Sequence, residues 1–182
     1  MSDLVAYWNR RYRRGKDSGA SSRGETAQAK ADLVNQTVQA NAYRTVVDWG
    51  VGDGQVARLF DIPVYYGLDV SVEAVRQARL RCGTRRGWTL QVIPPDGPTA
   101  YRGDLALSFD VLFHLTDDAA YRAHLDRLFG SANHVLIRAS NYDEPRDAHM
   151  RRRHWSPDIP DGWQMLARPD DDHGEGFWEL RR

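Results

Sequence analysis

Short apolar runs alternate along the chain with longer segments in which apolar residues recur every three or four positions. The runs are rich in β-branched and aromatic residues, as expected for buried strands. They occupy residues 45–48, 64–69, 88–93, 105–113 and 134–137. Because right-handed crossovers between parallel strands place helices on both faces of a sheet, this alternation predicts a doubly wound, mostly parallel α/β fold.

Several of the intervening segments carry residues that favour helix ends. Ser22 and Glu25 have the spacing of a capping box, so a helix of about four turns is expected to begin near Arg23. Serine and threonine favour helix N-termini, and glycine favours C-termini. Three further helices are predicted, over residues 55–60, from Ser71 to Gly83, and from Thr116 onward.

The two ends of the chain depart from this alternation. The first 24 residues combine aromatic and basic side chains with a Gly/Ser-rich segment at 15–24, and we interpret them as a mobile arm or lid. Near the other end, the runs at 163–167 and 177–180 predict an antiparallel hairpin. A chain of 182 residues has room for one domain, so residues 25–182 are expected to form a single core.

Charge and cysteine content exclude several classes of function. The 25 Lys and Arg residues balance the 25 Asp and Glu residues, so the net charge gives no general attraction to nucleic acid or to an anionic membrane. The single cysteine, Cys82, excludes an internal disulfide and every multi-cysteine metal site, and no metal site is predicted. No signal peptide and no membrane-spanning run is recognisable, so a cytoplasmic protein is expected.

The candidate chemistry follows the first two strands. Asp48 ends the first strand, and Gly50, Gly52 and Gly54 follow at every second position. Glycines let the backbone turn sharply and approach a ligand closely, and a following helix would present free N–H groups. Asp69 lies 21 residues beyond Asp48, at the end of the second strand, where a carboxylate can accept both hydroxyls of a ribose. Together these residues predict a nucleoside site.

The position of the third glycine separates two cofactor classes. A dinucleotide fingerprint would need a glycine at position 55, which is Gln55 here. The pattern with Gly54 instead resembles the first motif of class I S-adenosylmethionine-dependent methyltransferases, whose doubly wound sheet also carries a terminal hairpin. A nicotinamide-dependent enzyme is the less favoured alternative.

Two further segments strengthen this resemblance, which covers nearly the whole chain. Residues 104–118, with Asp110 followed by a hydrophobic pair and His114, are similar to the fourth-strand motif of the small bacterial methyltransferase-domain family. Residues 140–143, followed by His149 and an arginine cluster at 151–153, are similar to a bacterial subgroup of that family. The resemblance therefore implies a methyltransferase fold and S-adenosylmethionine as cofactor.

The resemblance also implies roles for particular residues. The three glycines would pass under the methionine part of the cofactor, and Asp48 would orient the loop and the cofactor amino group. Asp69 would hold the ribose and Val70 would contact the adenine. Asp96 stands roughly where the family contacts the adenine amine, and Asp110 is assigned to the same cofactor site.

Methyl transfer from a sulfonium is an in-line displacement, so the protein mainly holds donor and acceptor together and excludes water. A base is needed only for a hydroxyl or a protonated amine, and histidine suits that work. His114 and His149 follow strands four and five, on the edge where α/β sheets bind ligands, and are the candidate catalytic residues. For His114 the alternative is a structural role. Trp8 and Tyr12 would either close over the cofactor or attach the arm to the sheet.

So few residues lie outside the core that the acceptor is expected to be a small molecule, a sugar or another polar metabolite. A nucleic-acid methyltransferase is less favoured, because residues 108–111 lack the Asn/Asp-Pro-Pro-Tyr type of motif and Cys82 lacks a Pro-Cys context. The cluster at 151–153 is either a phosphate contact or a solvated face. RNA or modified-base chemistry and a non-catalytic cofactor-binding module stay open as alternatives.

Overall fold

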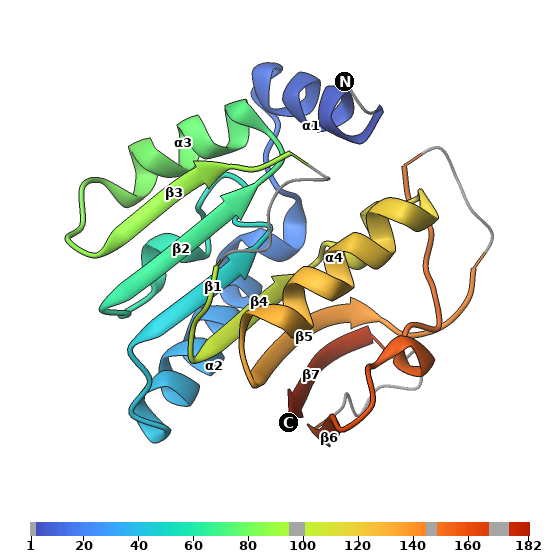
Figure 1. The fold of residues 1–182 in the computed structure, drawn as a ribbon. Helices are drawn as coiled ribbons and strands as arrows, with labels where there is room; N and C mark the ends of the chain where they lie inside the picture. The colour runs from blue at the N-terminus through green and yellow to red at the C-terminus, as the bar shows by residue number, and fades with distance from the viewer. Residues whose placement is uncertain (1–2, 95–100, 145–148, 168–174) are drawn as a thin grey trace.

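The computed structural model describes residues 3–94, 101–144, 149–167 and 175–182. In this part of the chain, seven strands form one sheet in the order β3-β2-β1-β4-β5-β7-β6 (Figure 1). Strands β1 to β5 run parallel, whereas β7 is antiparallel to both of its neighbours. The strands are β1 Thr45–Trp49, β2 Val64–Asp69, β3 Trp88–Val92, β4 Leu105–Phe109, β5 His134–Ser140, β6 Gln164–Ala167 and β7 Glu175–Arg181. The predicted doubly wound sheet with a terminal hairpin is confirmed.

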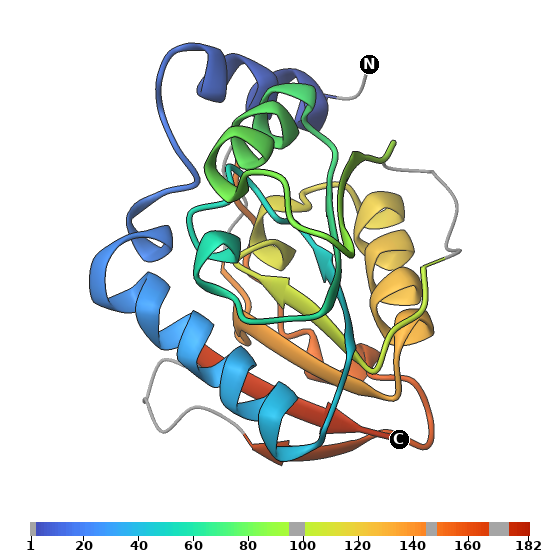
Figure 2. The ribbon, with the colours of Figure 1, turned by 90° about the vertical axis from the view of Figure 1, so that its left-hand side faces the viewer.

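Helices cover both faces of the sheet (Figure 2). The α-helices are α1 Asp3–Arg13, α2 Gly24–Ala40, α3 Val72–Cys82 and α4 Asp118–Ser131; the short 3-10 helices are η1 Ala20–Ser22, η2 Ala57–Leu59, η3 Leu112–His114 and η4 Ser156–Asp158. Apolar residues of α2 and α3 form one core, and those of α4 form a second core on the opposite face. Val46 and Val47 of β1 enter different cores, because successive side chains of a strand point to opposite faces.

The prediction of a helix over residues 55–60 is wrong, because only the short 3-10 helix η2 forms there. A segment of this length is too short to be a stable α-helix without strong packing. Side chains from elsewhere bind its terminal carbonyls: Arg85 donates to the carbonyls of Arg58 and Phe60, and Asn35 donates to that of Leu59. The glycine loop is therefore followed by a short turn and not by an α-helix with free N–H groups.

Strand β4 ends at Phe109, four residues before the predicted end at position 113. Asp110 has a φ of 58°, in the left-handed region, which ends the extended backbone. Residues Leu112–His114 then turn into η3. This change of direction returns His114 to the carboxyl edge of the sheet.

The predicted caps are confirmed for one helix and wrong for two. The side chain of Ser71 caps α3, and Gly83 follows its last turn, as expected. The N-cap of α4 is Asp117 instead of Thr116, because the Asp117 carboxylate accepts the N–H of Ala120. The N-cap of α2 is Arg23, which makes no side-chain cap. Ser22 therefore forms no capping box and lines a pocket instead.

The N-terminal segment contains a helix that the interpretation as a mobile arm did not include. Helix α1 crosses the carboxyl edge of the sheet and contacts α3 (Figures 1 and 2). Its residues Asn9 and Tyr12 are buried. Among the described residues, none of the helices has both the length and the apolar character needed to cross a membrane.

Candidate functional site

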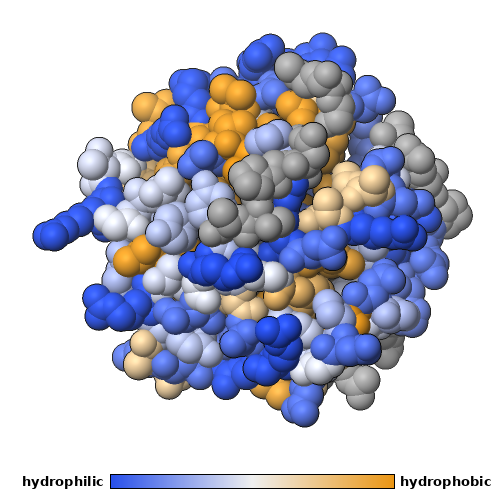
Figure 3. All heavy atoms as spheres, in the orientation of Figure 1, coloured by the Kyte–Doolittle hydropathy of each residue, from blue (hydrophilic) through white to orange (hydrophobic). Residues whose placement is uncertain are grey.

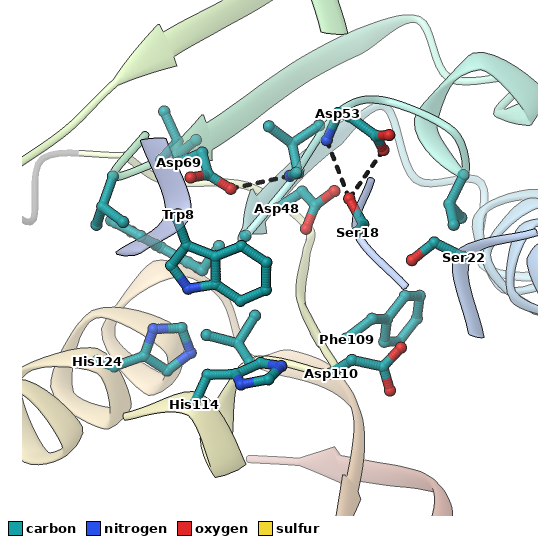
Figure 4. A pocket seen from close by; sticks show the side chains of 18 of the residues that line it. Trp8, Ser18, Ser22, Asp48, Asp53, Asp69, Phe109, Asp110, His114 and His124 are labelled. Carbon is teal, nitrogen blue, oxygen red and sulfur yellow. Dashed lines mark hydrogen bonds between the residues drawn. The ribbon is translucent and has the colours of Figure 1, made fainter. Parts of the chain in front are cut away.

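A pocket lies at the carboxyl edge of β1, β2 and β4 and beneath helix α1 (Figure 4). Trp8 and Tyr12 of α1 line one side of it, and Gly50 and Asp69 line another. On the face of the molecule shown in Figure 3, hydrophobic atoms gather beside α1 and the ends of β2 and β3. The structure therefore brings together side chains from segments that are far apart in the sequence.

The three glycines have positive φ values of 124°, 57° and 79° at Gly50, Gly52 and Gly54. Gly50 and Gly52 line the pocket, and a Cβ on them would collide with Val111 and Ser18, respectively. A Cβ on Gly54 would instead lie 2.8 Å from the Cα of Ala78 in α3. The first two glycines thus shape the pocket, whereas Gly54 allows α3 to approach the loop.

Asp48 lies at the bottom of the pocket and is almost completely buried. The hydroxyl of Tyr65 donates a hydrogen bond of 2.5 Å to its Oδ2 atom. Burial raises the pKa of Asp48 to about 7, against the lowering effect of that hydrogen bond. This carboxyl can therefore change its ionisation near neutral pH.

Asp69 stands at the end of β2 with both carboxylate oxygens directed by backbone donors. The N–H of Gly52 donates to Oδ2 at 2.9 Å, and the N–H of Ser71 donates to Oδ1 at 2.8 Å. The enclosing protein raises the pKa of Asp69 to about 6 by desolvation, although these hydrogen bonds act in the opposite direction. Val70 lines the pocket beside it. Asp69 and Val70, predicted to contact the ribose and the adenine respectively, therefore share one wall of the pocket with the glycine loop.

Asp110 lines the opposite wall and forms ion pairs with Lys30 and Arg138. The Lys30 ammonium lies 2.5 Å from Oδ2, the Arg138 guanidinium contacts Oδ1, and the Ser21 hydroxyl donates to Oδ2 at 2.7 Å. Burial alone would raise the pKa of Asp110, but the charges of Lys30 and Arg138 hold it below its ordinary value. This carboxylate is ionised and compensated by two cations.

Sequence analysis missed Lys30, whose side chain is 1% exposed and lines the pocket. A signal was present in the sequence. Ala27, Ala31 and Val34 form the buried face of α2, and Lys30 has the spacing of that face. A charged residue within an apolar stripe is rarely buried unless it is paired, so its position predicts a buried partner.

The two candidate histidines lie next to each other, but His114 contacts its neighbour through its ring and His149 through its backbone carbonyl. His114 lines the pocket, and its Nδ1 atom lies 3.2 Å from the backbone carbonyl oxygen of His149. Because a carbonyl oxygen only accepts, Nδ1 of His114 carries the hydrogen of this bond. The ring of His149 stacks on Tyr7 at 4.2 Å, and Trp8 contacts His114 edge-on at 4.9 Å. The backbone of His149 thus orients His114, while its ring packs against α1.

A third histidine, His124 of α4, also lines the pocket and was missed by sequence analysis. It is buried, and its Nε2 atom lies 2.8 Å from the Ser108 hydroxyl. Burial lowers the pKa of His124 to about 3, so its ring is neutral at physiological pH. A signal was present here too, because His124 has the spacing of the buried face of α4, which carries Tyr121, Leu125 and Leu128.

The arginine cluster at 151–153 is paired with carboxylates. Arg151 and Arg153 both form ion pairs with Asp118, at 2.8 and 2.7 Å, and Arg152 pairs with Glu144. These acidic partners reduce the positive charge that the cluster could offer to a phosphate. Asp96, the other residue assigned to the adenine, lies outside the described residues.

Comparisons with known proteins identify the fold. The sequence matches no protein-family model and no curated protein. Among solved structures, the N-methyltransferase NodS from Bradyrhizobium japonicum, in complex with S-adenosyl-L-homocysteine, has a TM-score of 0.71 at 14% identity, covering 100% of this chain and 99% of that chain. Magnesium protoporphyrin IX methyltransferase from Synechocystis, also with bound S-adenosyl-L-homocysteine, has a TM-score of 0.71 at 18% identity and covers 98% of both chains.

A third similar structure is an amino pentose methyltransferase from Micromonospora echinaspora, solved with bound S-adenosylmethionine. Its TM-score is 0.68 at 14% identity, covering 88% of this chain and 93% of that chain. This chain has the class I methyltransferase fold. In this fold the sheet order places the ends of β1 and β4 side by side, which is where the pocket lies.

Proposed function

We propose that this protein is an S-adenosylmethionine-dependent methyltransferase that acts on a small molecule, a sugar or another polar metabolite. One observation carries the proposal. The Asp69 carboxylate, at the end of β2, accepts a hydrogen bond from the Gly52 N–H in the glycine loop after β1, and both residues line one wall of the pocket. The fold supports it, since three proteins of this fold are named as methyltransferases with the cofactor or its demethylated product bound.

The residues of this wall fit the nucleoside part of the cofactor. Backbone hydrogen bonds from Gly52, Ser71 and Val70 fix the orientation of the Asp69 carboxylate. A carboxylate held at the end of the second strand in this way can accept hydrogen bonds from the hydroxyls of a ribose. Val70 gives the adjoining wall an apolar surface for the adenine ring.

The part of the pocket between Asp48 and Lys30 fits an amino acid group. Asp48 would accept hydrogen bonds from the ammonium group of the cofactor. Among the described residues, the Lys30 ammonium directs two of its three hydrogens to the Ser21 carbonyl and Asp110, so one is left for a ligand carboxylate. When bound, the cofactor supplies a methyl group on a positively charged sulfur.

We assign His114 the role of general base. Its ring lines the pocket, and the hydrogen bond from its Nδ1 to the His149 carbonyl holds the ring in place, so that the imidazole can serve an acceptor hydroxyl or ammonium. Trp8 packs against the same ring and helps to exclude water from the pocket. In this proposal His149 orients the base through its backbone and is not itself a base, which revises the role that the sequence suggested.

Two features favour a small acceptor over a nucleic acid. Helix α1 covers the pocket, so an acceptor has to be small enough to enter beneath it or beside it. The basic cluster at 151–153 is paired with Asp118 and Glu144, which leaves little positive charge for a phosphate backbone.

Calorimetry with S-adenosyl-L-homocysteine tests the cofactor, with NADH as the comparison ligand. We expect heat of binding with the first and none with the second. Incubation with radiolabelled S-adenosylmethionine and separate fractions of metabolites, glycans, protein and nucleic acid then identifies the acceptor class. Folded protein that binds neither S-adenosylmethionine nor its product would refute the proposal, and label in the nucleic-acid fraction would refute the acceptor class.

The role of His114 is tested with the His114→Ala variant, assayed on the fraction that accepts label from the wild-type enzyme. We expect kcat to fall by ~10²–10⁴-fold, the usual contribution of a general base, with little change in the Kd for S-adenosyl-L-homocysteine. His154 is an exposed histidine outside the pocket, and His154→Ala is the matched control. Equal losses of binding and stability in His114→Ala would show that His114 is structural.

A further inference from the structure

Asn9 connects the covering helix α1 to helix α3 through two hydrogen bonds. Asn9 as a whole residue is 5% exposed. The Oδ1 atom accepts the hydroxyl of Ser71 at 2.9 Å and the N–H of Glu73 at 3.2 Å. Figures 1 and 2 both show α1 lying against α3. Asn9 therefore acts as a second cap of α3, supplied from a different helix.

The same hydrogen bonds continue to the carboxylate that we assign to the ribose. Ser71 donates its N–H to Asp69, and Asp69 accepts the N–H of Gly52. The Ser71 hydroxyl also accepts the N–H of Ala74, so it is held on both sides. An uninterrupted series of hydrogen bonds thus runs from α1 through the start of α3 to the glycine loop.

The chain just after α1 is attached to the same loop at a second point. The Ser18 hydroxyl donates to the Asp53 carboxylate at 2.8 Å and accepts the N–H of Asp53 at 3.2 Å. The Tyr12 hydroxyl lies 2.9 Å from the same Ser18 oxygen. Figure 4 shows Ser18 directed at Asp53 beside the pocket. Contacts on both sides of the pocket therefore join α1 and the chain after it to the segments next to Asp69 and Gly52.

We propose that Asn9 is a positioning residue that couples the docking of α1 to the orientation of Asp69. This inference rests on the proposed function, since it gives Asp69 a ligand to hold. Coupling between two sites is reciprocal, so a ligand bound at Asp69 stabilises docked α1, and docked α1 strengthens ligand binding. Asn9 acts through Ser71 and has no contact with the ligand of its own.

Three variants separate positioning from general stability. Asn9→Ala removes the acceptor, and we expect the Kd for S-adenosyl-L-homocysteine to rise about tenfold, as for one lost hydrogen-bonded link. Asn9→Asp keeps an acceptor at the N-terminus of α3, and we expect near wild-type binding. Asn35→Ala is the control, because Asn35 also joins a helix to a loop by two hydrogen bonds, at Leu59 and Asp61.

Trypsin cleavage gives a second readout, because α1 contains Arg10, Arg11 and Arg13. S-adenosyl-L-homocysteine should slow cleavage within α1 in wild-type protein and in Asn9→Asp, but much less in Asn9→Ala. The proposal is overturned if folded Asn9→Ala binds as tightly as wild type, if Asn9→Asp fails to restore binding, or if Asn35→Ala weakens binding equally.

A double-mutant cycle without ligand keeps this inference separate from the proposed function. Asn9→Ala and Asp69→Ala should each speed cleavage within α1, and the double variant should be cleaved little faster than either, because both changes break the same series of hydrogen bonds. Fully additive effects would overturn the coupling. Absence of cofactor binding together with non-additive cleavage would refute the proposed function and leave the coupling in place.

Discussion

The two walls of the pocket carry aspartates in opposite surroundings. On the β1 and β2 wall, Asp48 and Asp69 receive hydrogen bonds from neutral donors, a tyrosine hydroxyl and backbone N–H groups. Burial raises the pKa of Asp48 to about 7 and that of Asp69 to about 6. On the β4 wall, burial would also raise the pKa of Asp110, but the Lys30 and Arg138 charges lower it.

This difference separates a binding role from a structural one. A carboxylate with neutral partners keeps an uncompensated charge, which a ligand with hydroxyl or ammonium donors can stabilise. A carboxylate between two cations is already compensated, and its main effect is to hold together the segments that carry those cations. We therefore expect changes at Asp48 and Asp69 to alter mainly ligand binding. Changes at Asp110 and Lys30 should alter mainly folding, in addition to any loss of the hydrogen bond that we assign to Lys30 and the ligand carboxylate.

The largest effect is expected from Lys30→Ala. This change removes the buried Lys30–Asp110 ion pair and leaves Asp110 with the Arg138 ion pair and no Lys30 charge. Breaking a buried ion pair typically costs about 3–5 kcal/mol of unfolding free energy. Urea denaturation measures it. Lys16 is exposed, so Lys16→Ala is the matched control. A loss no greater than that of Lys16→Ala would mean that the β4 wall does not depend on this ion pair.

Lys30 also shows what sequence analysis can and cannot find. The strands, the glycine loop and Asp69 were predicted because each signal lies within one short segment: an apolar run, alternate glycines, an acid at a strand end. The ion pair of Lys30 with Asp110 joins positions 80 residues apart, and the Asn9–Ser71 hydrogen bond joins positions 62 apart. No local pattern specifies a contact made only when the sheet assembles.

The predicted boundaries of two elements are wrong for a related reason. The sequence of residues 55–60 predicts a helix, but side chains from α2 and from the loop after α3 donate hydrogen bonds to the carbonyls at the end of this segment. The apolar sequence up to position 113 predicts a longer β4, whereas the backbone turns at Asp110. In both places tertiary contacts override the local preference.

The second prediction is that Asp48→Asn raises the unfolding free energy, whereas Lys30→Ala lowers it. A folded-state pKa near 7, above the ordinary 3.8, means that Asp48 contributes stability below pH 3.8 and loses it as the pH rises to 7. Asparagine cannot ionise and still accepts from Tyr65. Its stability relative to wild type should therefore grow from pH 4 to 7 and level off above, reaching about 2–4 kcal/mol.

Thermal unfolding between pH 4 and 8 measures this gain, and calorimetry should show weaker ligand binding in the same variant. Asp110→Asn is the contrasting change, because its carboxylate is stabilised by two cations and its loss should lower stability across the same range. Equal responses of the two variants would remove the distinction between the walls.

The third prediction is that Asp69→Ala weakens binding of S-adenosyl-L-homocysteine by about 1.5–3 kcal/mol, the range for hydrogen bonds to a charged group. Calorimetry at pH 8 measures the loss. Asp61 is exposed and lies outside the pocket, so Asp61→Ala is the control. A folded Asp69→Ala protein with wild-type affinity would remove Asp69 from the site.

The smallest effect expected is a change of affinity with pH in the wild-type protein. A protonated Asp69 has lost acceptor capacity, so binding should weaken as the pH falls through 6. Protonation one pH unit below the pKa costs about 1.4 kcal/mol, so the Kd at pH 5 should be roughly tenfold higher than at pH 8. Asp48→Asn should keep the part of this dependence centred near 6, because Asp69 is unchanged in it. Asp69→Ala should lose that part, and a Kd that rises equally in both variants would assign the titration to a different group.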